Sequence, residues 1–212
     1  MLDSYGFNLW ASDYDKSVGL SDEKNTYPFA GYKKLMNTIY NKIMNKKPAA
    51  ILDIGIGTAT LAAKLYESGN QITGIDFSDE MLDIAREKMP SAMLIKHDFT
   101  KGLPAELAGR KFDFIVSTYA IHHLTDLEKA SLIISALDYL NENGTILIGD
   151  VSFQSKEALE KCKNAHADDW DSDEYYFVVS DLGALLEGKC LLRYHEISYC
   201  AGILEVNIRG TC

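Results

Sequence analysis

The chain has 212 residues, of which 47% are hydrophobic and 25% charged, and this composition is that of a globular protein rather than a disordered or fibrous one. Asp and Glu number 31 against 21 Lys and Arg, and the formal net charge of -10 argues against a nucleic-acid partner, whose phosphates would repel it. No apolar run approaches the roughly 18 residues of a membrane span, and the start of the chain lacks the basic residues of a secretory signal. We therefore expect a cytoplasmic protein that has no membrane partner and acts on a small molecule.

Predicted elements follow one another in a regular order after an irregular beginning. Residues 1–31 form an aromatic-rich lead-in without a clear period, and a helix is expected over residues 32–47. Short β-rich runs then alternate with amphipathic stretches. The expected strands are 49–54, 71–75, 92–96, 112–117 and 145–148. The expected helices are 61–68, 79–89, 125–140, a stretch that begins at 155, and 180–186.

Two of these helices carry clear start or stop signals. Ser78 can cap the helix over 79–89, and Pro90 ends it, because the residue before a proline avoids helical conformation. Thr125 and Glu128 have the spacing of a capping box at the start of the next long helix.

Strand–helix alternation repeated five times predicts an α/β sandwich with a mostly parallel sheet. The last two runs, 191–199 and 202–208, are joined by only Cys200 and Ala201, which forces an antiparallel hairpin. No repeat or linker divides the chain, so we expect a single domain over residues 1–212. The four cysteines lack metal-binding spacing, so we expect reduced thiols and no metal. The oligomeric state, monomer or homodimer, stays open.

Ligand-binding residue types follow three successive strands. In such sheets, ligands bind beyond the carboxyl ends of the strands. Gly55 and Gly57 follow the first strand and allow a sharp turn with bare backbone, and Asp76 follows the second strand, 21 residues after Gly55, where a carboxylate can bind both ribose hydroxyls. Asp98 and Phe99 follow the third strand and can meet the amine and the face of a base. The combination predicts an adenosine-bearing ligand.

Two residues distinguish between adenosine cofactors. A dinucleotide-binding turn needs a third glycine where this chain has Thr60. Asp53 lies directly against the glycine turn, where it would repel a pyrophosphate and attract a cationic amine and sulfonium. The sequence therefore favours S-adenosylmethionine over NAD.

Four motifs carry a resemblance to the class I S-adenosylmethionine-dependent methyltransferases, which covers roughly residues 8–208. They read LDIGIGTATLAAKL, GIDFSDEMLDIAREK, IKHDF and FDFIVSTYAIHHLTDLEKA. The last of these, together with WASDYDKSV near the start, resembles the YrrT-like bacterial group of small-molecule methyltransferases. One departure is Ala59, where the commonest first motif has glycine.

The resemblance implies a Rossmann-like, seven-stranded, mostly parallel sheet with helices on both faces and a C-terminal antiparallel hairpin. It implies an N-terminal lid and helix over 1–48, a cofactor-binding core over 49–212, and an acceptor-side insertion at about 164–180. The cofactor contacts that it implies are Tyr14, Asp53, Gly55, Gly57, Asp76, Phe77, Asp98, Phe99 and Ser117.

Individual roles follow from the same resemblance. Asp53 would orient the methionine end of the cofactor above the two glycines, Asp76 would hold the ribose hydroxyls, and Asp98 would meet the adenine amine. Ser117 and the lid residue Tyr14 would lie near the amino-acid end. Asp76 could instead serve only the helix entry, and Asp98 could be a solvated turn residue.

Contacts with the methyl acceptor are harder to assign. The catalytic candidates are Tyr119, His122, Asp150 and Tyr176. His122 could line the acceptor pocket or only satisfy its loop, and adjacent residues on a turn are not expected to face one ligand together, which separates it from His123. Asp150 could bind the acceptor or act as a general base. His97 is expected to pack rather than to react.

Two aromatic segments leave alternatives open. The run DDWDSDEYYF over 168–177 could be a solvated face or, through Trp170, Tyr175 and Tyr176, an apolar wall of the acceptor site with polar tips. The aromatic residues at 27, 29 and 32 could form a lid or only a staple for the first helix.

The expected reaction is in-line transfer of the sulfonium methyl group to a small-molecule acceptor. Because the cofactor carries its own leaving group, orientation and exclusion of water are the main tasks of the protein, and orientation can supply about 7–11 kcal/mol. A non-catalytic S-adenosylmethionine-binding regulatory module and, with less support, an NAD-dependent oxidoreductase are the alternatives.

Overall fold

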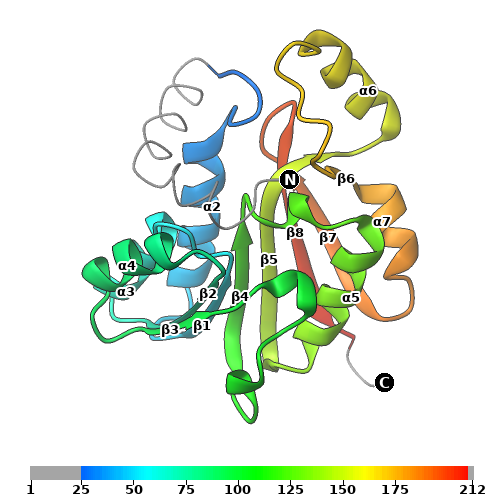
Figure 1. Cartoon of the computed structure of the whole chain (residues 1–212). Helices are drawn as coiled ribbons and strands as arrows, with labels where there is room; N and C mark the ends of the chain where they lie inside the picture. The colour runs from blue at the N-terminus through cyan, green and yellow to red at the C-terminus, as the bar shows by residue number, and fades with distance from the viewer. Residues whose placement is uncertain (1–24, 210–212) are drawn as a thin grey trace.

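The structure is a computed structural model that describes residues 25–209, and its strands form one sheet in the order β3-β2-β1-β4-β5-β8-β7 (Figure 1). The strands are β1 (Ala50–Ile54), β2 (Gln71–Asp76), β3 (Met93–Lys96), β4 (Phe112–Thr118), β5 (Leu140–Phe153), β6 (Phe177–Val178), β7 (Cys190–Glu196) and β8 (Ala201–Ile208). Strands β1 to β5 pair in parallel, whereas β8 runs antiparallel to both β5 and β7. The predicted parallel sheet and terminal hairpin are confirmed.

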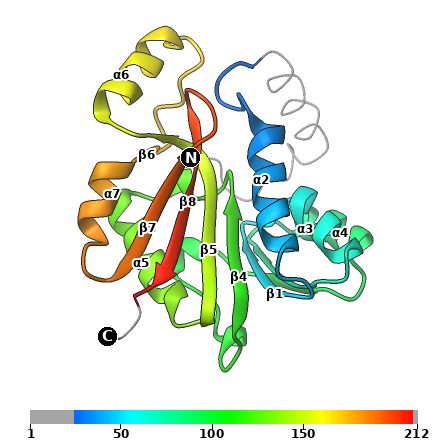
Figure 2. The same cartoon turned by 180° about the vertical axis from the view of Figure 1, so that it is seen from behind.

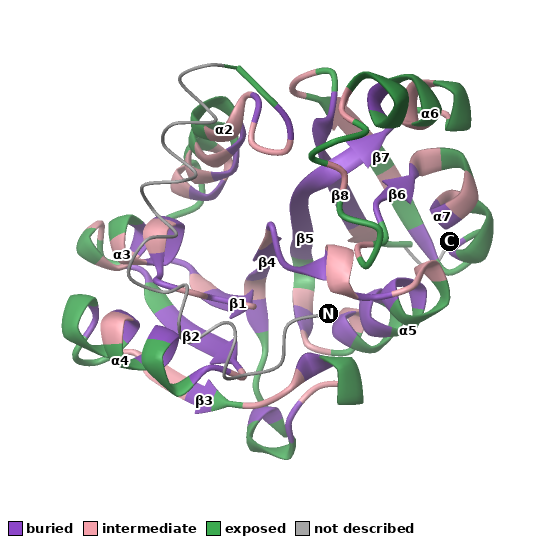
Figure 3. Ribbon diagram, turned by 45° about the horizontal axis from the view of Figure 1, so that its top comes forward, coloured by how far each residue is buried: buried purple, intermediate pink, exposed green. Residues whose placement is uncertain are grey.

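Helices cover both faces of this sheet (Figures 1 and 2). They are α2 (Tyr32–Met44), α3 (Thr60–Glu67), α4 (Asp79–Lys88), α5 (Asp126–Leu137), α6 (Lys156–Ala165) and α7 (Val179–Leu185), with 3-10 turns η1 (Phe99–Lys101), η2 (Ala105–Leu107) and η3 (Ile121–His123). Helices α2, α3 and α4 pack in one apolar cluster, and α5 and α7 pack in the other. Strand β1 serves both, because Ile51 belongs to the first cluster and Leu52 to the second. Figure 3 shows burial concentrated on the strands and on the inner sides of these helices.

The predicted helix starts have the expected cap geometry. The Ser78 hydroxyl accepts a hydrogen bond of 3.2 Å from the Met81 N–H at the start of α4. Thr125 and Glu128 form both halves of the capping box at the start of α5. These caps fix where α4 and α5 leave the carboxyl ends of β2 and β4, which is the edge of the sheet that holds the candidate site.

Strand β5 is longer than predicted, because its turn-like residues form an irregularity inside the strand rather than its end. Phe112 pairs with Leu140 and Phe114 with Thr145, so the residues up to Gly144 lie in a shift of register. Beyond Gly149, pairing with β8 continues the strand. The two-residue strand β6, which pairs with the end of β5, was not predicted.

Other expectations concern the membrane and the thiols. No helix within residues 25–209 combines the length and apolarity needed to cross a membrane. Cys162, Cys190 and Cys200 are buried free thiols. Cys212 lies outside the described residues.

Candidate active site

The strand order reverses between β1 and β4, and the loops that leave the carboxyl ends of the strands enclose a cavity of about 700 Å³. Open α/β sheets bind ligands at such a switch point, and small-molecule sites span roughly 300–1,000 Å³. The lining residues come from segments 27–36, 53–61, 76–81, 118–123 and 169–176, with Phe99 and Val151.

The turn after β1 brings bare backbone to the cavity wall. Gly55 and Gly57 have positive φ angles of 73° and 53°, which residues with a side chain rarely adopt. A Cβ on Gly55 would lie 2.5 Å from the Cβ of Ala120, whereas a Cβ on Gly57 would meet nothing within 4 Å. A ligand can therefore approach the chain closely at Gly57. Ala59 also has a positive φ, of 61°, so the position that departs from the commonest motif is strained.

Asp53 is a buried carboxylate beside this turn. It is 4% exposed, it lines the cavity, and its Oδ1 atom has no hydrogen-bond partner among residues 25–209. Burial, with a smaller contribution from the charge of Asp76, raises the pKa of Asp53 to about 7. A buried carboxylate without a partner is costly, so this atom is suited to accept a hydrogen bond from a ligand.

Asp76 is held in place by backbone amides. The Gly57 N–H donates to Oδ2 at 2.8 Å, and the Ser78 N–H donates to Oδ1 at 2.9 Å. Burial raises the pKa of Asp76, and these hydrogen bonds partly offset the effect. Asp53, Gly55, Gly57 and Asp76 thus lie together on one side of the cavity and form its glycine-turn half. Phe77 and Phe99 line the cavity as well.

Asp98 and Ser117 are not brought to the cavity wall. Asp98 accepts hydrogen bonds from the Thr100 N–H at 3.1 Å and the Thr100 hydroxyl at 2.6 Å, and it pairs with Lys101 at 3.1 Å. It therefore caps η1, as in the alternative of a turn residue. The pKa of Asp98 is lowered, because these hydrogen bonds and the charge of Lys101 outweigh its partial burial. His97 packs through a contact of 3.1 Å with the Gly102 carbonyl.

Ser117 faces the packed side of β4. Its hydroxyl donates to the Ile54 carbonyl at 2.8 Å, and the residue is 3% exposed. Its neighbours Thr118 and Tyr119 line the cavity instead. Tyr14 lies outside the described residues, as does the rest of the lead-in up to residue 24.

His122 lies on the opposite side of the cavity, where η3 leaves β4. Its Nδ1 atom is 2.8 Å from Oδ1 of Asp150, and its backbone N–H donates to Oδ2 of Asp150 at 3.3 Å. Burial would lower the pKa of His122, but the charges of Asp150 and Glu174 and the hydrogen bond that the ring donates to Asp150 outweigh it, so the pKa is raised. Asp150 is 1% exposed and does not line the cavity, so it holds His122 from behind rather than contacting an acceptor.

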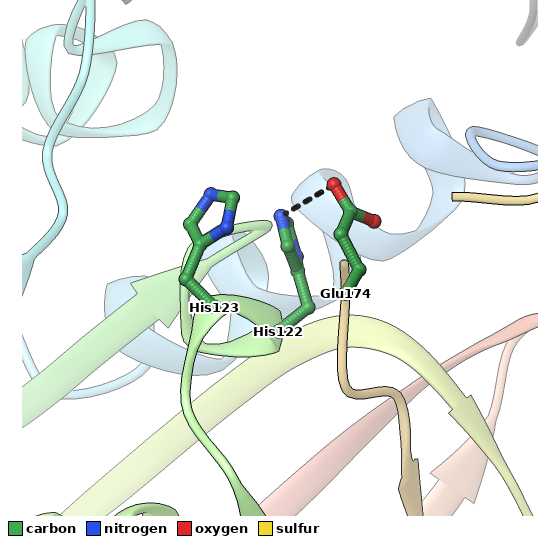
Figure 4. A group of neighbouring side chains, drawn as sticks. All are labelled: His122, His123 and Glu174. Atoms are coloured by element: carbon green, nitrogen blue, oxygen red, sulfur yellow. Dashed lines mark ion pairs between the residues drawn. The ribbon is translucent and has the colours of Figure 1, made fainter. Parts of the chain in front are cut away.

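The other ring nitrogen of His122 faces Glu174, which precedes β6 (Figure 4). Nε2 is 3.5 Å from Oε1 of Glu174, and the Tyr176 hydroxyl donates to Oε2 of Glu174 at 2.5 Å. The hydroxyls of Tyr176 and Tyr27 are hydrogen-bonded to each other. Tyr27, His122, Glu174 and Tyr176 form a continuous polar chain, the histidine half of the cavity.

The expectation that His122 and His123 do not face one ligand is wrong. Both side chains line the cavity, with ring centroids 4.3 Å apart, because η3 turns the backbone between them. Burial and the neighbouring His122 lower the pKa of His123 to about 4. One ring nitrogen of each histidine and one carboxylate oxygen of Glu174 lie within 4.8 Å of one another (Figure 4). A metal ion with bonds of about 2.0–2.1 Å would require these groups to move closer together.

Aromatic rings complete the wall. Tyr119, with a positive φ of 49°, packs its ring 5.2 Å from the rings of both Phe29 and Tyr32. All three line the cavity, so the aromatic segment before α2 is part of the wall rather than only a helix staple. Trp170 stacks on Tyr27 at 5.2 Å, behind the lining residues.

Sequence reasoning missed the residue that anchors the acidic segment. Lys129 of α5 is fully buried, donates to the carbonyls of Leu124 and Tyr175, and lies 3.3 Å from Asp126. The Tyr175 N–H in turn donates to the His122 carbonyl at 2.7 Å. These bonds hold residues 168–177, the acidic segment, against η3. The one sequence signal for Lys129 was that it lies in the otherwise apolar stripe of its helix.

Comparisons with known proteins agree with this geometry. Residues 51–144 match a family model described as a methyltransferase domain. An uncharacterised methyltransferase of Anoxybacillus flavithermus (strain DSM 21510 / WK1) is 38% identical over 154 residues, which are 73% of this chain and 69% of that relative. One of Alkaliphilus oremlandii (strain OhILAs) is 33% identical over 178 residues, 84% of this chain and 79% of the relative.

Solved structures share the fold at lower identity. An S-adenosylmethionine-dependent methyltransferase from Clostridium acetobutylicum ATCC 824 matches with a TM-score of 0.69 at 18% identity, over 93% of this chain and 99% of that one. The magnesium protoporphyrin IX methyltransferase from Synechocystis PCC 6803, solved with bound S-adenosylhomocysteine, matches with a TM-score of 0.66 at 16% identity, over 85% of each chain. The sequence relatives and the family model show that the chain belongs to the methyltransferases, and the solved structures show that it shares the fold of S-adenosylmethionine-dependent members.

Proposed function

We propose that this protein transfers a methyl group from S-adenosylmethionine to a small-molecule acceptor. The observation that carries the proposal is the buried Asp53 carboxylate, which faces the cavity beside the glycine turn with one oxygen unpartnered among the described residues. That oxygen fits the cationic amine of S-adenosylmethionine. When bound, the cofactor supplies a methyl group already activated by a positive sulfur.

The glycine-turn half binds the cofactor in this proposal. Asp53 accepts from its amine, and Gly57 lets it approach the backbone, while Gly55 makes room for Ala120. Asp76 accepts from the ribose hydroxyls while its oxygens stay fixed by amide N–H groups. Phe77 and Phe99 flank the base. Asp98 and Ser117 have no part in it, since hydrogen bonds to Thr100 and to the Ile54 carbonyl hold them away from the cavity wall.

The histidine half receives the acceptor. His122 takes a proton from the acceptor through Nε2, because Asp150 occupies Nδ1 and fixes the ring orientation. Asp150 is a positioning residue. The rings of Tyr119 and Tyr176 form walls around the acceptor and exclude water.

Some expectations that arose from the sequence extend this proposal. Residues 1–48 would form an N-terminal lid and helix, and the segment at about 164–180 would be the acceptor-side insertion of a single domain. A cytoplasmic location, membership of the YrrT-like group, and a monomer or homodimer stay predictions.

Calorimetric titration with S-adenosylmethionine, S-adenosylhomocysteine and NAD tests the cofactor. Micromolar binding of the two sulfur compounds without binding of NAD is expected, and binding of NAD alone would favour the oxidoreductase. Asp53→Asn should weaken binding, whereas Asp83→Asn on the exposed side of α4 should not. Binding without turnover on a broad acceptor panel would favour a regulatory module.

A further inference from the structure

We propose that the methyl acceptor is an amine that enters the cavity as an ammonium cation and is methylated on nitrogen. This inference rests on the proposed function and names the substrate class of the same site. It follows from the charge and ring composition of the cavity wall.

The cavity wall carries a strongly one-sided charge. Six carboxylates line it, and none of the described lining residues is Lys or Arg. Two of the six belong to the glycine-turn half. The other four surround the histidine half and are Asp169, Asp171, Asp173 and Glu174. An anionic acceptor would meet repulsion there, whereas a cation would be attracted.

The charged groups that face His122 have the same sign, with one exception. Asp150 and Glu174 contact its two ring nitrogens. The exception is the Lys129 ammonium, which is buried outside the cavity lining and held by two carbonyls and by Asp126. Lys129 therefore stabilises the wall of the cavity without presenting a positive charge to the acceptor.

Glu174 is the carboxylate placed best for a cation. It is partly buried, whereas the three aspartates of the segment are exposed at the rim. The Tyr176 hydroxyl donates to its Oε2 atom, which fixes the side chain and leaves Oε1 directed at the His122 ring and the cavity. An ammonium group at this point would meet a fixed negative partner.

Aromatic rings add a second feature of ammonium sites. Tyr27, Phe29, Tyr32, Tyr119 and Tyr176 all line the cavity. Cations are attracted to the faces of such rings by the negative charge of the ring face. Carboxylate and rings together recognise an alkylammonium better than an alcohol or an acid of the same shape.

The chemistry balances with groups already described. The ammonium gives one proton to Nε2 of His122, and the neutral nitrogen then uses its lone pair to form a bond to the methyl carbon. The carbon–sulfur bond breaks, and its electron pair stays on sulfur. The products are the N-methylammonium and S-adenosylhomocysteine, and the proton leaves His122 for solvent.

A charge series of one shape tests the inference by binding alone. The protein loaded with S-adenosylhomocysteine is titrated by calorimetry with choline, its neutral isostere 3,3-dimethylbutan-1-ol, and 3,3-dimethylbutanoate. Choline should bind about tenfold more tightly than the alcohol, and the anion most weakly. Equal binding of all three, or preference for the anion, would overturn the inference.

Variants locate the effect. Glu174→Gln should remove most of the preference for choline over the alcohol, whereas Glu187→Gln, which removes the same charge at an exposed position outside the cavity, should keep it. A preference that survives Glu174→Gln would contradict the assignment of Glu174.

Turnover on pooled amines, alcohols, thiols and carboxylic acids, read by mass spectrometry, should give methylated amines. Methylated acids or alcohols, or anion binding that requires added Zn²⁺ or Mn²⁺ on His122, His123 and Glu174, would overturn the inference. Failure of S-adenosylhomocysteine to bind would instead contradict the proposed function.

Discussion

The two halves of the cavity are built in different ways. In the glycine-turn half, the candidate residues lie at the carboxyl ends of β1 and β2 or in the turn after β1, and backbone amides of these turns fix the oxygens of Asp76. In the histidine half, Tyr27 and Tyr176 meet across 149 positions of sequence, on segments outside the parallel core strands. The geometry of the sheet therefore fixes the first half, whereas a few side-chain contacts assemble the second.

The largest expected effect is on proton transfer in the histidine half. His122→Asn should lower turnover by about 10²–10⁴-fold, the usual contribution of a general base. Asp150→Asn removes the charge that raises the pKa of His122. The acid limb of the pH–rate profile should then move to lower pH, and the plateau rate should fall. An unchanged limb would show that His122 is not the titrating base.

Backbone access in the glycine-turn half can be separated from backbone strain. Gly57 and Gly69 both have positive φ, and a Cβ on either would meet nothing within 4 Å. Alanine at either position should therefore cost a similar 1–2 kcal/mol of stability. Only Gly57→Ala places a methyl group in the cavity, so it alone should weaken S-adenosylmethionine binding at least tenfold by calorimetry. An equal loss of affinity for S-adenosylmethionine in both variants would contradict a close approach of the cofactor to Gly57.

The raised pKa of Asp53, about 7, predicts a pH dependence of cofactor binding. Above pH 7 the Asp53 carboxylate is ionised and can pair with an amine. Below pH 7 the Asp53 carboxyl group must first lose its proton. The affinity should therefore fall by up to tenfold per pH unit as the pH decreases from 7 to 5. Asp53→Asn should bind weakly with little dependence on pH. A wild-type affinity that is flat over this range would contradict the pairing.

The smallest effect concerns strain in the glycine turn. Ala59→Gly relieves a positive φ worth about 1–2 kcal/mol but loses a buried methyl group worth about 0.8 kcal/mol and adds chain entropy. The stability to urea should change by less than about 1 kcal/mol. Ala62→Gly, equally buried inside α3, has no strain to relieve and should cost about 1.5–2 kcal/mol. Equal losses would mean that the strain at Ala59 is negligible.

Sequence reasoning predicted the positions of the candidate residues at the ends of strands. Asp53, Gly55 and Asp76 were predicted to lie together because the carboxyl ends of parallel strands share one edge, and the structure brings them together. Ser117 was predicted at the site, but side chains alternate along a strand, so Ser117 faces the packed side while its neighbour Thr118 lines the cavity. Asp98 finds local partners in the following turn.

The histidine half could not be predicted in the same way. Glu174 lies beside His122 on a segment that Lys129 holds through the carbonyl of Tyr175, and no sequence periodicity links these residues. His122 and His123 share the cavity because, in a 3-10 turn, neighbouring side chains point in less different directions than in an extended strand.

The hydrogen bond between Tyr27 and Tyr176 has a consequence for how such proteins diverge. It joins two segments that can change their side chains without altering the pairing of any core strand. In the function proposed here, natural selection can therefore exchange the acceptor while it preserves the residues that bind the methyl donor. Identity between two chains of this kind will report common descent of the donor site more faithfully than a common substrate.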